Sequence, residues 1–490
     1  MKVLLVCHID SRPSMAIMHL SAALRRAGHA VGVAHLSPAH VGRALERERF
    51  DVIALSYPTC YAASAAALCR RVRERFSGPI LAGGPHPTYR PESTLAEPAI
   101  DAVCRGEGEQ SLVEGLAAIA GGGSLGDVAG WWARRDGEIV RAPLRPLWTA
   151  LDDLPHPDRD ILLPHLTFGE HVQPFLFTRG CTFSCTYCFE PVFRRLFHDL
   201  GPAVRRRSVE SAVEELLQVK RTRDVRLNMI YDDTFNLDRA WLHAFCRLYA
   251  EKVRVPFTCK VRPDLLDEES VRALARAGCV LVFLGIESGD EGVRKQLLGR
   301  SASDGSLRQA SDWIHRHAMK LVTYNMVAVP GTSFKDDLRT LDLNIACKPD
   351  MTMVMYLQPY AGTRIHETAV RLGVWGAADD ERLERSGREL YHRSLLRFPV
   401  ARDRRRVENL RSLFGIALAL PGLRRWIPLL VELPLDDLYA RLCAAWYLRC
   451  HFRVLYRGMA SPYQLLRAAL RERFPALRPF FGSRGPADAA

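Results

Sequence analysis

Short apolar runs alternate with helical patterns along the first part of the chain. Residues 2–7, 30–35 and 51–57 are strand candidates, and helical patterns occupy residues 15–28 and 62–76. Strands separated by helices of this length form βαβ units of a parallel, doubly wound sheet. Ligands bind such sheets at the carboxyl ends of the strands. We therefore expect binding loops directly after these strands.

A second α/β pattern follows a connecting segment. Residues 121–123 are all glycine, residues 131–148 predict a hairpin, and residues 154–157 are rich in proline. Six strand candidates then alternate with helical intervals, which favours a barrel or partial barrel with reactive groups at the strand ends. These candidates are residues 175–178, 226–231, 257–261, 280–286, 321–329 and 351–357.

Beyond about residue 378 the pattern changes to helices rich in arginine, leucine and tryptophan. Residues 413–430 mix apolar side chains with two arginines, so this segment is a candidate for contact with a membrane surface. Packing against the preceding domain is the favoured alternative. The patterns predict an α/β protein with a doubly wound domain (1–125), a hairpin and Pro-rich linker (126–170), a partial (β/α)6 barrel (171–375) and a mainly helical domain (376–490).

Composition excludes several classes of protein. The 490 residues are enough for about three domains, and 48% hydrophobic with 25% charged residues argues against disorder and against a polytopic membrane protein. The net charge of +13 lies in scattered arginine clusters, which permit an anionic partner without choosing one. The thirteen cysteines are an odd number and most stand singly among apolar residues. This usage predicts reduced thiols and a cytoplasmic location.

The strongest chemical signal is the group Cys181, Cys185 and Cys188. Three thiolates within eight residues can hold three corners of one metal centre, and the spacing supplies no fourth cysteine. Structural zinc normally has four protein ligands, whereas a four-iron cluster held by three thiolates keeps one iron open to an exogenous ligand. The open position favours the cluster over zinc and over a chance grouping of thiols.

This CxxxCxxC spacing, with the aromatic Tyr187 before the last cysteine and a strand before the loop, resembles the radical S-adenosylmethionine superfamily. The resemblance implies that Cys181, Cys185 and Cys188 hold a 4Fe-4S cluster. It further implies that S-adenosylmethionine binds the fourth iron and yields a 5′-deoxyadenosyl radical after one-electron reduction. Two carboxylates stand where the family more often has Gly-Gly-Glu. The residues implied in binding S-adenosylmethionine are Tyr187, Asp232, Asp233, Arg262, Glu287, Ser288 and Val327.

The doubly wound domain in front of this barrel resembles the cobalamin-binding domain of the cobalamin-dependent branch. The Asp-x-His-x-x-Gly signature of many cobalamin proteins is absent. The resemblance therefore implies cobalamin bound without a histidine ligand, or with a weak one. A degenerate domain that holds no corrin is the alternative. The residues implied in cobalamin binding are His8, Ser11, Ser56, Tyr57, Gly83, Gly84, Pro85, His86 and Glu107.

We expect from this resemblance an enzyme, a methyltransferase that moves methyl from methylcobalamin to an unactivated carbon. Cyclisation, rearrangement or oxidation with the same cofactors is the alternative, and an iron-sulfur electron-transfer protein is the alternative from another class. The expected partners are a small-molecule, lipid or peptide substrate and an external one-electron reductant of the flavodoxin or ferredoxin type. Nucleic acid is not expected, and the C-terminal helices are candidates for peripheral membrane contact.

Overall fold

The computed structural model describes residues 1–9, 14–166 and 171–455. The chain divides into two compact units. The first contains residues 1–169, 195–205 and 381–388, and the second contains the remainder of the chain. Within the described ranges, no helix is long and apolar enough to cross a membrane.

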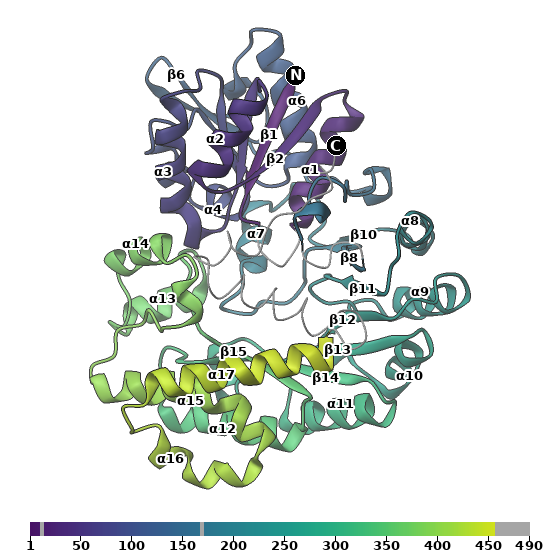
Figure 1. Ribbon diagram of the computed structural model, residues 1–490, viewed down its shortest axis with the longest axis vertical. Coiled ribbons are helices and arrows are strands. Elements are labelled where there is room, and N and C mark those ends of the chain that lie inside the picture. The colour runs from purple at the N-terminus through teal and green to yellow at the C-terminus, as the bar shows by residue number, and fades with distance from the viewer. Residues whose placement is uncertain (10–13, 167–170, 456–490) are drawn as a thin grey trace. The chain divides into compact units, whose positions relative to one another are not determined.

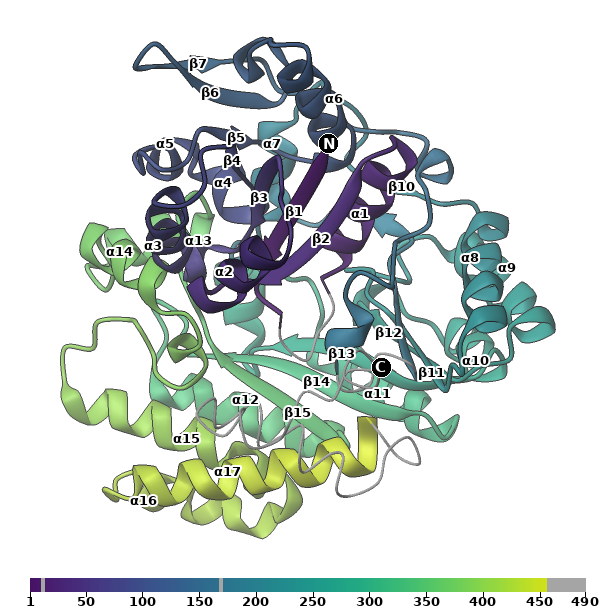
Figure 2. The same cartoon turned by 45° about the horizontal axis from the view of Figure 1, so that its top comes forward.

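The first unit is built on a seven-stranded sheet with the strand order β2-β1-β3-β4-β5-β6-β7 (Figure 2). Strands β1 to β5 run parallel, and the β6–β7 hairpin continues the sheet antiparallel to β5. Because the order reverses between β1 and β3, a ligand crevice is expected at the carboxyl ends of these two strands. The strands are β1 (Lys2–Cys7), β2 (Ala30–His35), β3 (Val52–Ser56), β4 (Ile80–Gly83), β5 (Ala102–Cys104), β6 (Trp131–Arg135) and β7 (Glu138–Arg141).

Burial on both faces explains the uninterrupted apolar runs of this sheet. In β1, Leu4 and Val6 pack into one core, while Val3 and Leu5 pack into the core on the opposite face. The helices are α1 (Met15–Arg26), α2 (Pro38–Arg47), α3 (Ala62–Arg73), α4 (Pro85–Tyr89), α5 (Pro91–Leu95) and α6 (Gly108–Ala120).

The second unit contains a six-stranded, fully parallel sheet in the order β15-β14-β13-β12-β11-β8 (Figure 1). Each new strand adds on the same side of the sheet, as in a partial barrel. The predicted fold class, with its doubly wound sheet and its six-unit partial barrel, is confirmed. The strands are β8 (Val172–Phe175), β11 (Leu227–Ile230), β12 (Phe257–Val261), β13 (Cys279–Glu287), β14 (Lys320–Val327) and β15 (Met351–Tyr356), and the short β9 (Thr178–Arg179) and β10 (Arg205–Arg206) pair separately.

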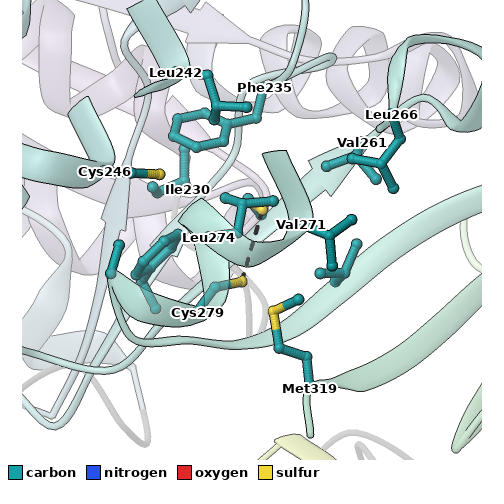
Figure 3. Close-up of a cluster of buried hydrophobic side chains, with 14 of the residues drawn as sticks. Ile230, Phe235, Leu242, Cys246, Val261, Leu266, Val271, Leu274, Cys279 and Met319 are labelled. Carbon is teal, nitrogen blue, oxygen red and sulfur yellow. Dashed lines mark hydrogen bonds between the residues drawn. The ribbon is translucent and has the colours of Figure 1, made fainter. Parts of the chain in front are cut away.

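One large apolar cluster joins this sheet to the helices on one of its faces (Figure 3). Leu242 and Cys246 from α9 and Val271 and Leu274 from α10 lie within it. The helices of the second unit are α8 (Val209–Thr222), α9 (Arg239–Lys252), α10 (Glu268–Arg276), α11 (Asp304–Arg316), α12 (Phe334–Cys347), α13 (Arg364–Arg371), α15 (Ala401–Ala419), α16 (Ile427–Leu430) and α17 (Asp436–Cys450), while α7 (Glu190–Leu196) and α14 (Ala377–Arg385) each have residues in both units.

The C-terminal helices cover the edge of this sheet. The Nε of Arg411 on α15 donates to the carbonyl of Val354 at 3.1 Å, and the Val354 N–H donates to the Tyr447 hydroxyl on α17 at 3.4 Å. Val354 lies on β15, the edge strand, whose backbone groups would otherwise be open to pairing with another chain. These helices therefore belong to the second unit.

The β6–β7 hairpin and the end of β8 differ from what the sequence predicts. The hairpin that the sequence places in a linker extends the first sheet, because Ala102 to Cys104 of β5 pair with β6. The first strand of the second sheet ends at Phe175, earlier than predicted. Its continuation is diverted because the Phe177 N–H donates to the carboxylate of Asp232 at 2.8 Å instead of to a neighbouring strand.

Candidate functional site

The three predicted cluster cysteines lie on one loop of the second unit, between β9 and α7. The Cys188 N–H donates to the carbonyl of Cys185 at 3.2 Å. Glu190, the first residue of α7, accepts from the Cys181 N–H at 3.1 Å and donates its own N–H to the Cys188 sulfur at 3.4 Å. Local hydrogen bonds thus set the course of the loop that carries all three thiols.

Side chains from outside the loop hold it in place. Arg194 donates to the carbonyl of Phe183 and to the Ser184 hydroxyl, both at 2.9 Å. The Thr186 N–H donates to the carbonyl of Leu298 at 3.1 Å. The loop is therefore attached to α7 on one side and to the segment after β13 on the other.

The donor set fits a cluster better than a single ion. In the part of the chain that the structure describes, no three His, Cys, Asp or Glu side chains are grouped so as to hold one metal ion. Structural zinc requires four ligands at one point, whereas three thiolates that each bind a separate iron need no common point. Burial raises the pKa of Cys181, and it raises that of Cys188 to about 12. Iron binding must therefore displace protons from these thiols.

Cys188 differs from the other twelve cysteines in being only partly buried. Ten lie outside the cluster loop, among them Cys259 and Cys279, whose sulfurs are 3.9 Å apart in the apolar cluster of Figure 3. Packing accounts for these ten, as the sequence predicts for thiols that stand among apolar residues.

An arginine directly after β12 reaches the cysteine loop. Nη1 of Arg262 lies 3.6 Å from the sulfur of Cys185, and its guanidinium carbon lies 3.4 Å from the centre of the Phe183 ring. The side chain is also paired with Asp264. The structure thus brings Arg262, which the resemblance implies in S-adenosylmethionine binding, against a cluster ligand.

Tyr187 and Glu287 meet through Arg300. Nη1 of Arg300 donates to the Tyr187 hydroxyl at 3.3 Å and lies 3.5 Å from the carboxylate of Glu287, while Nη2 donates to the carbonyl of Gly285 at 3.0 Å. Burial raises the pKa of both Tyr187 and Glu287. Arg300 could not be identified from the sequence, because it follows Glu287 by thirteen residues and belongs to no recognisable motif.

The two carboxylates after β11 differ in their surroundings. Asp232 is fully buried, accepts from the Phe177 N–H, and has its pKa raised to about 6 by burial. The side chain of Asp233 is 60% exposed and lies 4.0 Å from Lys260. Only Asp233 therefore presents its carboxylate outward, while Asp232 holds the backbone at the end of β8.

Ser288 and Val327 offer little side-chain surface. Val327 is fully buried at the end of β14, and the Ser288 hydroxyl accepts from the Asp290 N–H at 3.3 Å. Next to Val327, the N–H of Ala328 donates to the buried carboxylate of Asp337 at 3.3 Å. Any contact of Val327 with a ligand would therefore involve its backbone.

The residues predicted for cobalamin binding lie after parallel strands of the first unit. His8 follows β1, while Ser56 and Gly83 end β3 and β4. All three therefore lie at the carboxyl ends of the parallel strands, where the strand order reverses between β1 and β3. A bound corrin fits this edge, where a ligand crevice is expected. Ser11 lies outside the described residues.

The remaining predicted residues of this edge already have structural partners. His86 and Tyr57 are buried against each other, and burial lowers the pKa of His86 to about 4. Gly84 has φ of +90°, and a Cβ added there would lie 2.7 Å from the Ser56 hydroxyl oxygen. Pro85 begins α4, and Glu107 accepts two hydrogen bonds of 2.8 Å from Arg205.

Comparison with known families places both units. Residues 175–343 match the radical SAM superfamily, and residues 1–116 match the B12 binding domain. These matches bear out the predicted cofactors: a 4Fe-4S cluster, S-adenosylmethionine and cobalamin.

Several curated relatives are methyltransferases or cyclases. An uncharacterized methyltransferase of Pyrococcus horikoshii is 28% identical over 59% of this chain and 63% of its own. Cytidylyl-2-hydroxyethylphosphonate methyltransferase of Streptomyces wedmorensis is 28% identical over 44% of this chain and 46% of its own. Anaerobic magnesium-protoporphyrin IX monomethyl ester cyclase of Synechocystis is 25% identical over 74% and 73%. The chain thus spans less than two thirds of the first two relatives.

Solved structures share the fold over most of the chain. The methyltransferase TsrM of Kitasatospora setae, with cobalamin and a [4Fe-4S] cluster bound, superposes with a TM-score of 0.63 at 15% identity, over 87% of this chain and 99% of its own. The cobalamin-dependent radical enzyme OxsB gives a TM-score of 0.62 at 15% identity, over 96% and 75%. The order of the two matched domains and this shared fold agree with the resemblance found in the sequence: the chain joins a B12 binding domain to a domain of the radical SAM superfamily.

Proposed function

We propose that this protein is a methyltransferase acting on an unactivated carbon of its substrate. The observation that carries the proposal is the presence in one chain of a three-thiol loop within a radical SAM domain and of a B12 binding domain. When bound, the cofactors supply the electron, the hydrogen-abstracting radical and the transferable methyl group. The similarity to named methyltransferases supports this reaction.

The residues of the second unit have separate tasks in this proposal. Cys181, Cys185 and Cys188 hold the cluster, and their loop leaves one iron for S-adenosylmethionine. Asp233 is placed to accept from the amino group of S-adenosylmethionine, because its carboxylate is exposed. The buried Glu287, held by Arg300, keeps the end of β13 in a fixed geometry. A fixed, water-poor site favours a radical reaction because it limits competing reactions.

The experiment that tests the proposal follows the methyl group. The protein is reconstituted anaerobically with iron, sulfide and cobalamin, then given reductant and methyl-labelled S-adenosylmethionine. We expect 5′-deoxyadenosine together with label on the protein-bound cobalamin. Deoxyadenosine without labelled cobalamin would instead support radical cyclisation, rearrangement or oxidation, which the similarity to cyclases favours as the second candidate.

The variant Cys185→Ala tests the cluster assignment. Loss of one of three thiolate ligands should lower iron content about tenfold or more and abolish deoxyadenosine formation. Cys443→Ala, a buried cysteine on α17, is the matched control and should retain its iron. Retained S-adenosylmethionine cleavage in Cys185→Ala would contradict the assignment.

We also propose two partners for this chain. One is an external one-electron reductant, which would reduce the cluster. The other is an anionic lipid surface, which would contact exposed apolar side chains near the C-terminus. Seven large apolar side chains with exposures of 39 to 63% occupy the 23 residues from 420 to 442, and we call them the C-terminal leucine surface. They are Leu420, Trp426, Leu429, Leu433, Leu435, Leu438 and Leu442.

The backbone beneath this surface is fixed. Asn409 donates to the carbonyls of Val431 and Leu433 at 3.0 and 3.1 Å, and the Tyr439 hydroxyl donates to the carbonyl of Leu430 at 2.9 Å. Residues 401–455 contain ten arginines and five carboxylates. The arginine excess belongs to residues 401–455 as a whole, because residues 420–442 themselves carry three arginines and three carboxylates. Together with the exposed leucine and tryptophan side chains, this excess complements the negative charge and the apolar interior of an anionic bilayer.

A further inference from the structure

Arg262 is fixed by bonds on every side. Its Nε and Nη2 donate to the two oxygens of Asp264 at 3.0 and 2.7 Å. Its backbone N–H donates to the Asn236 side-chain oxygen at 2.9 Å, and the Asn236 amide donates back to the Arg262 carbonyl at 2.9 Å. The residue is 5% exposed. The guanidinium therefore has one position, with Nη1 directed at the Cys185 sulfur.

The partner carboxylate is itself held in its ionised form. The Ser301 hydroxyl donates to Asp264 at 2.7 Å, in addition to the two bonds from Arg262. Burial acts to raise the pKa of Asp264, but these hydrogen bonds outweigh it, and the pKa is lowered. A fixed ion pair thus stands beside one cluster ligand, with the cation nearer to the sulfur.

We propose that Arg262 is a positioning residue that raises the reduction potential of the cluster through its hydrogen bond to Cys185, and that Asp264 limits this effect. The inference rests on the proposed function only in taking Cys185 as a cluster ligand. Reduction adds one negative charge to the cluster, and a neighbouring cation stabilises that charge. Hydrogen bonds to cluster sulfurs and nearby charge are known means of setting the potential. The effect is strong here because the pair is shielded from water.

The test is a redox titration of the reconstituted cluster in the absence of S-adenosylmethionine, in which electron paramagnetic resonance measures the reduced fraction at each potential. Arg262→Met removes the donor and the charge, so we expect a more negative midpoint potential. Asp264→Asn keeps the shape but removes the opposing charge, so we expect a less negative one. Arg316→Met, an exposed arginine paired with Glu268 on α10, is the control and should leave the midpoint unchanged.

The opposite directions keep the inference testable if one variant fails to hold iron. Shifts of opposite sign support it, and Asp264→Asn alone decides when Arg262→Met loses its cluster. An unchanged midpoint in the loaded variants, or a shift of both in the same direction, would overturn it. A wild-type protein that assembles no reducible cluster would remove the cluster assignment as well, so failure of the proposed function is distinguished from failure of this inference.

Discussion

Two residues near the site adopt the left-handed backbone region without being glycine. Glu287 has φ of +67° at the end of β13, and Ala328 has φ of +58° after β14. Contact between Cβ and the backbone makes this conformation cost about 1–2 kcal/mol for a residue other than glycine. Both positions are held by buried partners, Arg300 and Asp337 respectively.

Ala328→Gly should stabilise the protein by up to about 1 kcal/mol, because relief of the left-handed strain outweighs the added freedom of the unfolded chain. Urea unfolding measures the change. Ala117→Gly, at an exposed position of α6, is the matched control and should destabilise by about 1 kcal/mol. A loss of stability in Ala328→Gly equal to that of the control would contradict the strain argument.

Asp337 should make stability depend on pH. Burial raises its pKa to about 8, far above that of an unfolded aspartate. The folded protein therefore holds the proton more tightly, and the free energy of unfolding falls as pH rises from about 4 to about 8. Asp337→Asn removes this dependence, so its stability relative to wild type should increase by more than about 1 kcal/mol between pH 5 and pH 9. An equal difference at both pH values, measured by urea unfolding, would refute the assignment.

For single residues, the sequence predicts which side chains carry chemistry better than it predicts which side chains lie in contact. The spacing of Cys181, Cys185 and Cys188 is local, so the loop could be recognised directly. The bond between Arg262 and Cys185 joins residues 77 positions apart, and Asp337 looks like an ordinary first-turn acid of α12. Only the folded chain shows which of these polar groups are buried.

Among the elements, α15 and α17 make an unusually close contact. A Cβ at Gly415 would lie 2.4 Å from the ring of Trp446, so glycine is required for these helices to pack. The same pair covers β15, which makes the contact part of the sheet's edge protection.

Gly415→Ala should lower the free energy of unfolding by about 1–2 kcal/mol, since the displaced tryptophan costs more than the alanine gains in helix propensity. Gly42→Ala in α2 is the matched control. No atom lies within 4 Å of its added Cβ, so it should stabilise by about 0.5–1 kcal/mol. Urea unfolding of both variants decides, and a gain of stability at Gly415 would show that the ring moves freely.

The boundaries of most helices and strands follow the apolar runs closely. The two strand features that the sequence does not predict have a common cause. Strand 30–35 was predicted in full because its pattern is local. The union of the β6–β7 hairpin with β5 and the early end of β8 both depend on partners distant in the chain, namely Cys104 with Trp131 and Phe177 with Asp232.

For the molecule as a whole, the C-terminal leucine surface supplies a test of membrane contact. We expect wild-type protein to sediment with phosphatidylglycerol vesicles at low salt and to be released as salt rises. Leu429→Ser with Leu438→Ser should weaken this binding about tenfold or more, because both side chains lose apolar contact with the bilayer.

Leu372→Ser is the control for this measurement. Leu372 is 48% exposed but lies outside the C-terminal leucine surface, so its replacement should leave vesicle binding unchanged. Wild-type protein that stays in the supernatant at low salt would contradict the proposal. A self-associating protein whose oligomers are lost in the double variant would show that a second copy covers this surface instead.

The order of the parts along the chain was predictable because each part has its own period and its own motif. Residues 413–430 illustrate the limit. Leu413, Phe414 and Ala417 are buried against the rest of the unit, whereas Leu420, Trp426 and Leu429 are exposed. Packing and membrane-surface contact are the alternatives that the sequence offers for this segment. The structure buries the first part of it and leaves side chains of the second part exposed, and membrane contact stays a prediction.

The uneven burial of the thirteen thiols gives a direct way to follow assembly of the centre. Cys188 is the one cysteine that is not buried, so in protein without iron an alkylating reagent should reach it before the other twelve, at an alkaline pH that ionises part of this high-pKa thiol. Iron on that sulfur would block the reagent. The mass of the peptide around Cys188 would therefore report the fraction of molecules that carry the cluster, independently of turnover and before any substrate is known.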